Sequence, residues 1–325
     1  ESIIGQNHYI GGKAMQLENI ISNKKLSPEL TRVDVLAAGF PCQAFSIAGY
    51  RKGFKDDRGN VFFRIIEIIK FLKRNRGAPK VIFLENVKNF KTHDNRNTYK
   101  VVKERLEKLN YSVYTKIINT SKITDIPQNR ERTFMVCFHK ESKWKNFQLD
   151  ENNEELFTAK ELSKAKRLCP KTFLYHQNFN RLKHPETKNI WSILDRADKV
   201  SDRYFYTHTK YPEAFARIKE DVNKKNTLYQ YRRVYVRENQ SNECPTLTAN
   251  MGTGGHNVPI VLVNKNKDRY RKLTPKECFR FQGYKDFILP SDVADGQLYK
   301  QAGNSVTVPV INIIAKIIKS VLVQK

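Results

Sequence analysis

Apolar and polar residues alternate in a regular way over the first part of the chain. Short apolar runs, which predict buried strands, take turns with segments whose apolar residues recur every three or four positions and predict helices. The predicted strands are residues 33–38, 80–84, 112–119 and 133–138, and the predicted helices are residues 61–74 and 97–109. Strands that alternate with helices predict an α/β fold whose sheet is mostly parallel.

The later part of the chain has a less regular pattern. Residues 139–170 are rich in charge, and residues 171–262 are largely irregular. The segments with a clear pattern are short strands at 233–236 and 258–263 and helices at 271–283 and 308–323. We therefore expect a second, less regular region in addition to the α/β part.

Basic residues outnumber acidic residues, and this excess narrows the range of partners. The 325 residues hold 59 Lys and Arg against 33 Asp and Glu, a formal net charge of +26. A field of this size favours a polyanionic partner such as nucleic acid. No apolar run approaches the ~20 residues of a membrane span, which predicts no membrane association. The 5 cysteines form no C-x-x-C pair and show no ligand spacing with histidine, so we expect a reducing compartment and no metal site.

Two short loops carry candidate chemistry at the ends of predicted strands. Cys42 follows the strand at 33–38 in a turn that Pro41 stiffens, and Glu85 ends the strand at 80–84. Ligands of open α/β sheets bind beyond the carboxyl ends of the strands, so neighbouring strands would bring this thiol and this carboxyl together. There a thiol near cations becomes a nucleophile, and a buried carboxyl donates a proton. Alternatively, Cys42 is a packing residue and Glu85 is a helix cap or an ion-pair partner.

A third segment, Gln-Asn-Arg-Glu-Arg at 128–132, leads into the strand at 133–138. Side chains alternate along extended backbone, so Arg130 and Arg132 should point to one side and reach an anion or a carbonyl in the crevice. Alternatively, both are solvated surface charges.

Five blocks, in this order, resemble the signatures of the bacterial cytosine-5 DNA methyltransferases of type II restriction-modification systems. They are Gly-Phe-Pro-Cys-Gln at 39–43, Glu-Asn-Val at 85–87, Gln-Asn-Arg-Glu-Arg at 128–132, Arg-Lys-Leu-Thr-Pro-Lys-Glu-Cys at 271–278 and Gln-Ala-Gly-Asn-Ser-Val at 301–306. The resemblance implies the mixed, Rossmann-like α/β sheet of S-adenosylmethionine-dependent methyltransferases, with a second, smaller, irregular β-rich target-recognition domain. It assigns residues 1–165 and 296–325 to the catalytic and cofactor-binding domain, and residues 166–295 to target recognition and a hinge.

The resemblance also implies a reaction and the residues that carry it out. The Cys42 thiolate adds to carbon 6 of a target cytosine and so makes carbon 5 nucleophilic. Glu85 acts as the acid near ring nitrogen 3, and Arg132 holds the cytosine carbonyl oxygen while Arg130 supports the loop. The base cannot be reached inside a duplex, so it is flipped out into the pocket.

Further residues are implied to contact S-adenosylmethionine and DNA. Those expected beside the cofactor are Asn19, Ile20, Pro41, Val61, Asn304 and Val306. Those expected at DNA are Ser46 and Ala48 in a mobile closing loop, and Arg232, Arg233, Arg237, Thr246, Thr248, Gly254 and Gly255 in the recognition region. Arginine pairs bidentately with guanine, and glycine lets the backbone approach DNA closely. Alternatively, the recognition residues are polar strand ends and turns.

The chain departs from the family pattern before Cys42. Family members there have a strand with a Phe-x-Gly-x-Gly turn that wraps the cofactor, followed by an acid for the ribose, and neither is recognisable here. Asn19 stands where the family usually has Asp, which keeps an acceptor for adenine but loses the charge; a solvated turn is the alternative. The expectation is a truncated sequence, or a split enzyme whose partner chain supplies the cofactor turn.

Together these observations predict a monomeric enzyme of the bacterial cytoplasm that methylates a short palindrome in double-stranded DNA. One alternative is a tRNA cytosine-5 methyltransferase. That branch typically has a second proline before Pro-Cys and a short recognition region, whereas Phe40 precedes Pro41 here and the variable region is long. The other is a non-catalytic DNA-binding relative that keeps the fold and has lost the cofactor.

Overall fold

The computed structural model describes residues 33–40, 60–75, 77–140, 159–183, 185–186, 188–232, 235–239, 242–252, 257–285 and 287–323. They belong to two compact units. The first takes its described residues from Glu1–Ile118, Arg132–Leu182 and Ala315–Lys325, and the second takes them from Asn119–Glu131 and Lys183–Ile314.

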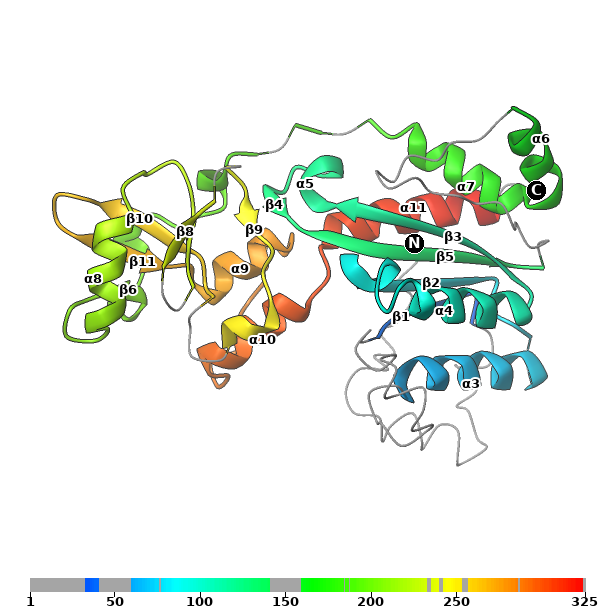
Figure 1. The fold of residues 1–325 in the computed structure, drawn as a ribbon, viewed down its shortest axis with the longest axis horizontal. Coiled ribbons are helices and arrows are strands. Elements are labelled where there is room, and N and C mark those ends of the chain that lie inside the picture. The colour runs from blue at the N-terminus through cyan, green and yellow to red at the C-terminus, as the bar shows by residue number, and fades with distance from the viewer. Residues whose placement is uncertain are drawn as a thin grey trace. The chain divides into compact units, whose positions relative to one another are not determined.

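A mixed sheet of four strands forms the centre of the first unit (Figure 1). In spatial order the strands are β1 (Val35–Gly39), β2 (Val81–Val87), β5 (Glu131–His139) and β3 (Tyr111–Asn119). β1 and β2 are parallel, whereas β2 and β5 are antiparallel. The mixed sheet that the resemblance implied is therefore confirmed. The alternation of strands and helices did not predict the direction of β5, because the helix between β3 and β5, α5 (Thr120–Ile123), has only four residues and is too short to form a crossover.

Helices pack on both faces of this sheet (Figure 1). On one face, α3 (Asn60–Asn75) and α4 (Asn97–Lys108) follow β1 and β2, near the lengths that the apolar periodicity predicted. They bury a stripe of apolar side chains against the strands, namely Phe62, Ile65, Ile66, Ile69, Val102 and Leu106. On the other face, α6 (Ala159–Leu168) leads into α7 (Pro170–Asn180), where the ring of Tyr175 lies 5.2 Å from that of Tyr114. A short 3-10 helix, η4 (Lys88–Lys91), follows β2.

The second unit is built around an antiparallel sheet. Its strands, in spatial order, are β6 (Phe205–Tyr206), β11 (Arg269–Lys272), β10 (Ile260–Asn264), β7 (Tyr229–Tyr231) and β8 (Val236–Glu238). A separate parallel pair joins β4 (Gln128–Asn129) to β9 (Cys244–Pro245). The helical segments are α5 (Thr120–Ile123), η5 (Ile190–Ser192), η6 (Ala197–Lys199), η7 (Asp202–Tyr204), α8 (Pro212–Asp221), η8 (Ala249–Gly252), α9 (Pro275–Phe281) and α10 (Asp295–Asn304).

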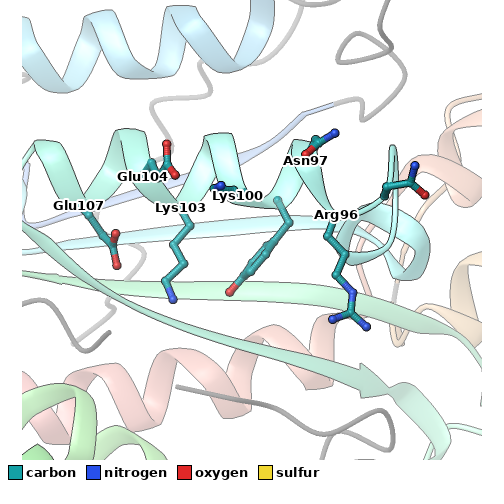
Figure 2. A pocket seen from close by; sticks show the side chains of 8 residues that line it. Arg96, Asn97, Lys100, Lys103, Glu104 and Glu107 are labelled. Atoms are coloured by element: carbon teal, nitrogen blue, oxygen red, sulfur yellow. The ribbon is translucent and has the colours of Figure 1, made fainter. Parts of the chain in front are cut away.

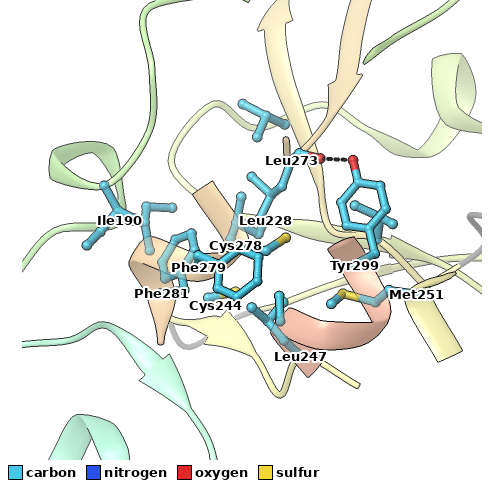
Figure 3. Packing of buried hydrophobic residues seen from close by; sticks show 14 of the residues in the cluster. Ile190, Leu228, Cys244, Leu247, Met251, Leu273, Cys278, Phe279, Phe281 and Tyr299 are labelled. Carbon is cyan, nitrogen blue, oxygen red and sulfur yellow. Dashed lines mark hydrogen bonds between the residues drawn. The ribbon is translucent and has the colours of Figure 1, made fainter. Parts of the chain in front are cut away.

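A second hydrophobic core holds this unit together (Figure 3). Its members come from α9, α10, η8 and the strands, and they include Leu247, Met251, Cys278, Phe281 and Tyr299. The Tyr299 hydroxyl, on α10, donates a hydrogen bond of 2.5 Å to the carbonyl oxygen of Leu273. The buried phenol therefore keeps its polar group satisfied inside the apolar core.

The last helix, α11 (Val308–Val323), is a core helix in its packing. The segment Asp295–Val323 is long and apolar enough to cross a membrane by length and composition. However, it consists of α10 and α11, which are separate helices, and one apolar stripe of α11 is buried in the protein. Its residues are Val310, Ile314, Ile317, Ile318 and Val321.

The predicted start of one helix differs from the structure. The helix predicted at 271–283 is β11 followed by α9. Thr274 starts α9 with a capping box, in which its hydroxyl accepts from the Glu277 amide and the Glu277 carboxylate accepts from the Thr274 amide. Because this cap fixes the start of the helix, the residues before it extend the sheet.

The two compact units also differ from the predicted domains. Residues 166–182 belong to the first unit, where α7 packs on the sheet, although we expected them in the recognition domain. Residues 119–131 and 296–314 belong to the second unit. The reason is close packing: a Cβ at Gly303 would overlap the Thr248 carbonyl group, so α10 lies directly on the segment before η8.

Candidate active site

The carboxyl ends of β1 and β2 lie side by side in the first unit. Gly39, the last residue of β1, is paired in register with Glu85 of β2. The Asn86 side chain donates a hydrogen bond of 2.8 Å to the carbonyl oxygen of Phe40, and its own oxygen accepts one of 2.8 Å from the Val87 amide. Asn86 is buried, so this bond ties the end of β2 to the residue that precedes Pro41. Pro41 and Cys42 themselves lie outside the described residues.

Glu85 has one carboxylate oxygen toward each of two neighbouring strands. Its Oε1 lies 3.2 Å from Nε of Arg132, which is on β5. Its Oε2 faces β1, because a Cβ built on Gly39 would lie 3.6 Å from that oxygen. The carboxyl group is therefore held between Arg132 and the strand end that leads, three residues later, to Cys42. The predicted convergence of Glu85 with Cys42 stays a prediction, because Cys42 lies outside the described residues, whereas the ion pair of Glu85 with Arg132 is seen in the structure.

The register of the antiparallel pair explains this geometry. Arg132 is opposite Val87, and Glu85 is opposite Phe134, so Glu85 and Arg132 are diagonal neighbours on one face of the sheet. Their side chains are 22% and 15% exposed. Burial lowers the pKa of the Arg132 guanidinium, and the Glu85 carboxylate acts in the opposite direction. Arginine has a very high ordinary pKa, so Arg132 remains a cation at neutral pH.

Arg130 has different partners from Arg132. Its side chain is 3% exposed and belongs to the second unit. It donates hydrogen bonds of 2.8 Å to the carbonyl of Leu247, 3.2 Å to that of Gly303 and 2.7 Å to that of Ser305. Arg130 is therefore not the solvated surface charge of the alternative interpretation, while its role in supporting the loop stays a prediction.

Among the residues that we expect to contact DNA, those that the structure describes are in the second unit. Arg232 donates to Gln230 at 2.8 Å and to Asn257 at 3.4 Å, and Arg237 is exposed on β8. The Thr246 hydroxyl donates a bond of 2.6 Å to the carbonyl of Asn129, and Thr248 is exposed. Arg232 and Thr246 thus also have contacts within the unit. Ser46, Ala48, Arg233, Gly254 and Gly255 lie outside the described residues.

The structure describes only some of the residues that we expect to contact the cofactor. Val61 is half-buried in the first turn of α3, and Val306 is half-buried in the link between α10 and α11. Asn304, the last residue of α10, is exposed. Asn19, Ile20 and Pro41 lie outside the described residues. Apolar side chains suit an adenosyl group, and an amide suits an amino-acid moiety. The chemistry of these residues is therefore compatible with S-adenosylmethionine.

A hollow of about 360 Å³ runs along α4 in the first unit (Figure 2). Its lining includes Arg96, Lys100, Lys103, Glu104 and Glu107. None of the residues predicted from the signature blocks lines it, so we do not assign the reaction to this hollow.

Three buried amide side chains of this region were not singled out from the sequence. Asn86 bonds to Phe40, directly after β1, while Gln128 and Gln282 hold segments of the second unit together. Asn86 and Gln128 are inside the quoted signature blocks, so their position in a motif could have marked them as functional residues. Nothing in the pattern marked Gln282.

Solved methyltransferase structures share this fold. The S. pombe Dnmt2 methyltransferase matches 90% of this chain and 79% of its own, with a TM-score of 0.56 and 14% identity. A DNMT2 variant of Spodoptera frugiperda matches 95% of this chain and 90% of its own, with a TM-score of 0.60 and 17% identity. The chain therefore has a methyltransferase fold, in which a mixed sheet is accompanied by a second, antiparallel one.

Sequence comparison identifies the family. The model for C-5 cytosine-specific DNA methylases matches residues 7–320. Type II methyltransferase M.Bsp6I of Bacillus sp. (strain RFL6) is 43% identical over 97% of this chain and 91% of its own length. Type II methyltransferase M.HhaI of Haemophilus parahaemolyticus is 36% identical over 90% of this chain and 77% of its own. The chain belongs to the C-5 cytosine-specific DNA methylases and is a DNA (cytosine-5-)-methyltransferase, as its signature blocks predicted.

Proposed function

We propose that this protein is the modification enzyme of a type II restriction-modification system. It transfers a methyl group from S-adenosylmethionine to carbon 5 of a cytosine in one short duplex sequence, which protects the host DNA from a cognate endonuclease. The observation that carries this proposal is the Glu85–Arg132 pair at the carboxyl end of β2, beside the strand end that leads to Cys42. The bacterial type II relatives support the same function.

The pair gives each side chain a definite role toward a flipped cytosine. The Cys42 thiolate forms a bond to carbon 6, and the electron pair of the ring double bond moves toward carbon 5. Glu85 supplies the proton that stabilises the ring at nitrogen 3, and Arg132 donates to the carbonyl oxygen at carbon 2. A carboxyl group and a guanidinium held 3.2 Å apart can meet ring nitrogen 3 and the carbonyl oxygen on the neighbouring carbon 2.

The rest of the cycle reverses the addition. After methylation, the proton on carbon 5 leaves to a base, the bond from sulfur to carbon 6 breaks so that Cys42 leaves as a thiolate, and nitrogen 3 returns its proton to Glu85. Arg130 does not enter these steps in our proposal; its hydrogen bonds are to carbonyls of the second unit.

S-adenosylmethionine, when bound, supplies an electrophilic methyl group. Val61 and Val306 would border it, Asn304 would hydrogen-bond to its amino-acid part, and Asn19, Ile20 and Pro41 would complete the site. The high positive charge fits a duplex partner through its phosphates. We infer that one chain acts on each target, and that it does so in the bacterial cytoplasm, where the host DNA lies.

The proposal is tested by following labelled methyl groups from S-adenosylmethionine into unmethylated duplex DNA and, in parallel, into tRNA. Bisulfite sequencing of the DNA then locates the modified cytosine. We expect label in duplex DNA, at carbon 5 of a cytosine in one short sequence, and none with Cys42→Ser. Label in tRNA alone, or methylation without sequence preference, would contradict the type II assignment.

A further inference from the structure

The segment that begins the Gln-x-Arg-x-Arg block is joined to the predicted recognition segment by several hydrogen bonds. β4 and β9 pair in register, with Gln128 opposite Cys244 (Figure 1). The Cys244 amide donates to the Pro127 carbonyl at 2.6 Å, and the Thr246 hydroxyl donates to the Asn129 carbonyl at 2.6 Å. These bonds hold the start of the recognition segment along its backbone.

Arg130 adds a second connection between the Gln-x-Arg-x-Arg block and the recognition segment. Its guanidinium donates to Leu247, whose side chain is buried in the core of the unit (Figure 3). The same group donates to Gly303 and Ser305, which are at the carboxyl end of α10. Carbonyls at a helix end lack partners within the helix and favour a cation, so Arg130 caps α10 while it holds Leu247.

Buried amides extend this arrangement. Gln128 Nε2 donates to the Phe281 carbonyl at 2.5 Å, and Gln282 Nε2 donates to the Ala302 carbonyl at 2.9 Å. The Thr307 hydroxyl donates to Gln282 Oε1 at 3.1 Å. Gln128, Gln282 and Thr307 are all buried, so breaking one of these bonds leaves a buried polar group without its partner.

We propose that Gln128 and Arg130 are positioning residues for sequence specificity. This inference rests on the proposed function, because it concerns how a DNA target is selected. The two side chains fix residues 246–248, predicted to face DNA, against α10. Base recognition depends on the exact placement of hydrogen-bonding groups, whereas phosphate attraction tolerates small shifts. Loosening this segment therefore reduces discrimination between cognate and near-cognate sites more than it reduces the rate of methyl transfer.

Arg130→Lys is the test variant, because lysine keeps the charge but loses the fork that reaches three carbonyls. The matched control is Arg280→Lys. Arg280 is half-buried in the same unit and donates to Ile193 and Asp195, away from residues 246–248. The assay measures kcat and KM on duplexes that carry the mapped site or one altered base pair, together with the melting temperature.

In Arg130→Lys we expect the ratio of kcat/KM for cognate over near-cognate DNA to fall roughly tenfold or more. kcat at saturating cognate DNA should stay within about threefold of the wild-type value, and the change in kcat/KM should come from KM. Arg280→Lys should lower the melting temperature without changing the ratio. An unchanged ratio in folded Arg130→Lys would overturn the inference, as would a loss confined to kcat, which would place Arg130 in the chemistry.

If Arg130→Lys does not fold, Thr307→Val serves as the second variant. It preserves shape and removes the bond to Gln282, and we expect a smaller change of the ratio in the same direction; no change would overturn the inference. Failure of the proposed function looks different, because the wild type would then show no preferred DNA site at all. If the wild type is site-specific and the variants discriminate equally well, the positioning role is contradicted and the proposed function is not.

Discussion

Asn86 and Phe40 are joined by a hydrogen bond of 2.8 Å from the Asn86 side chain to the Phe40 carbonyl oxygen. The bond connects β2, which carries Glu85, to the backbone that leads into Pro41 and Cys42. Phe40 is also packed between Phe62 of α3 and Phe90 of η4, with ring centroids 5.3 and 5.5 Å away. Phe40, two residues before the proposed nucleophile, is therefore fixed by a polar contact and by aromatic packing.

Asn86→Ala should lower kcat by roughly 10- to 100-fold while DNA binding stays nearly constant. Removing the amide frees the Phe40 carbonyl, and a displacement of about 1 Å at a reacting group has effects of this size. The free energy of unfolding should fall by about 1–3 kcal/mol, since a buried acceptor loses its partner. Single-turnover methylation and urea unfolding measure the two effects. Asn89→Ala, on the exposed surface of η4, is the control, and equal rates for both variants would contradict the role of Asn86.

Glu85→Gln should reduce the rate of methyl transfer by ~10²-fold or more with little change in DNA affinity. The amide keeps the size of the side chain but cannot donate the proton that the transition state requires. Rates at saturating DNA and binding isotherms separate the two quantities. Glu67→Gln is the matched control, because Glu67 is paired with Arg64 at 2.9 Å on α3 of the same unit. A wild-type rate in Glu85→Gln would remove Glu85 from the reaction.

Cys42 should form a stable covalent adduct with duplex DNA that contains 5-fluorocytosine at the target position. Fluorine cannot leave as a cation, so elimination stops and the bond from sulfur to carbon 6 persists. The cysteines that the structure describes are buried, and burial raises the pKa of the Cys137, Cys244 and Cys278 thiols, which disfavours their thiolates. Denaturing gels should show the adduct in wild type and in Cys169→Ala but not in Cys42→Ser. An adduct that survives Cys42→Ser would identify another nucleophile.

Much of the first unit could be predicted from the sequence because its signals are local. The apolar stripes of α3 and α4 have helical spacing, and the runs at β1 and β2 have the length of buried strands. The position of Glu85 followed from the rule that strand ends meet at one sheet edge. Its contact with Arg132 depends on the register of β2 with β5, which no local pattern specifies.

The roles within the second unit could be predicted only in part. Arg130 and Arg132 look equivalent in the sequence because both alternate with polar neighbours. Their partners differ because Arg130 meets carbonyls from Leu247 and Gly303, more than 100 positions further along the chain. The capping box of Thr274 and Glu277 is a local signal, and it marks the start of α9 that the apolar periodicity placed too early.

His139, the last residue of β5, should make the stability of the protein depend on pH. Burial, together with Lys73, Lys140 and Lys171, lowers the pKa of its imidazole from the ordinary 6.5, and its buried Nε2 has no hydrogen-bond partner among the described residues. Below pH 6.5 the unfolded chain then binds more protons than the folded one, so stability is lost as the pH falls through 6.5 toward the folded pKa. The melting temperature between pH 7.5 and 5.5 should drop more steeply in wild type than in His139→Gln. Parallel curves would show that His139 does not contribute.

Two glycines of α10 offer a matched pair that tests the packing beneath the recognition segment. A Cβ at Gly303 would overlap the backbone of Thr248, which cannot move without shifting residues 246–248, whereas a Cβ at Gly296 would lie 3.1 Å from the Gly252 carbonyl oxygen. Gly303→Ala should therefore lower the free energy of unfolding by about 2–3 kcal/mol. Gly296→Ala should change it by less than about 1 kcal/mol, because the gain in helix propensity offsets the tight contact. Urea unfolding of both variants measures the difference, and equal stabilities would show that α10 and the Thr248 segment are not packed as closely as the structure places them.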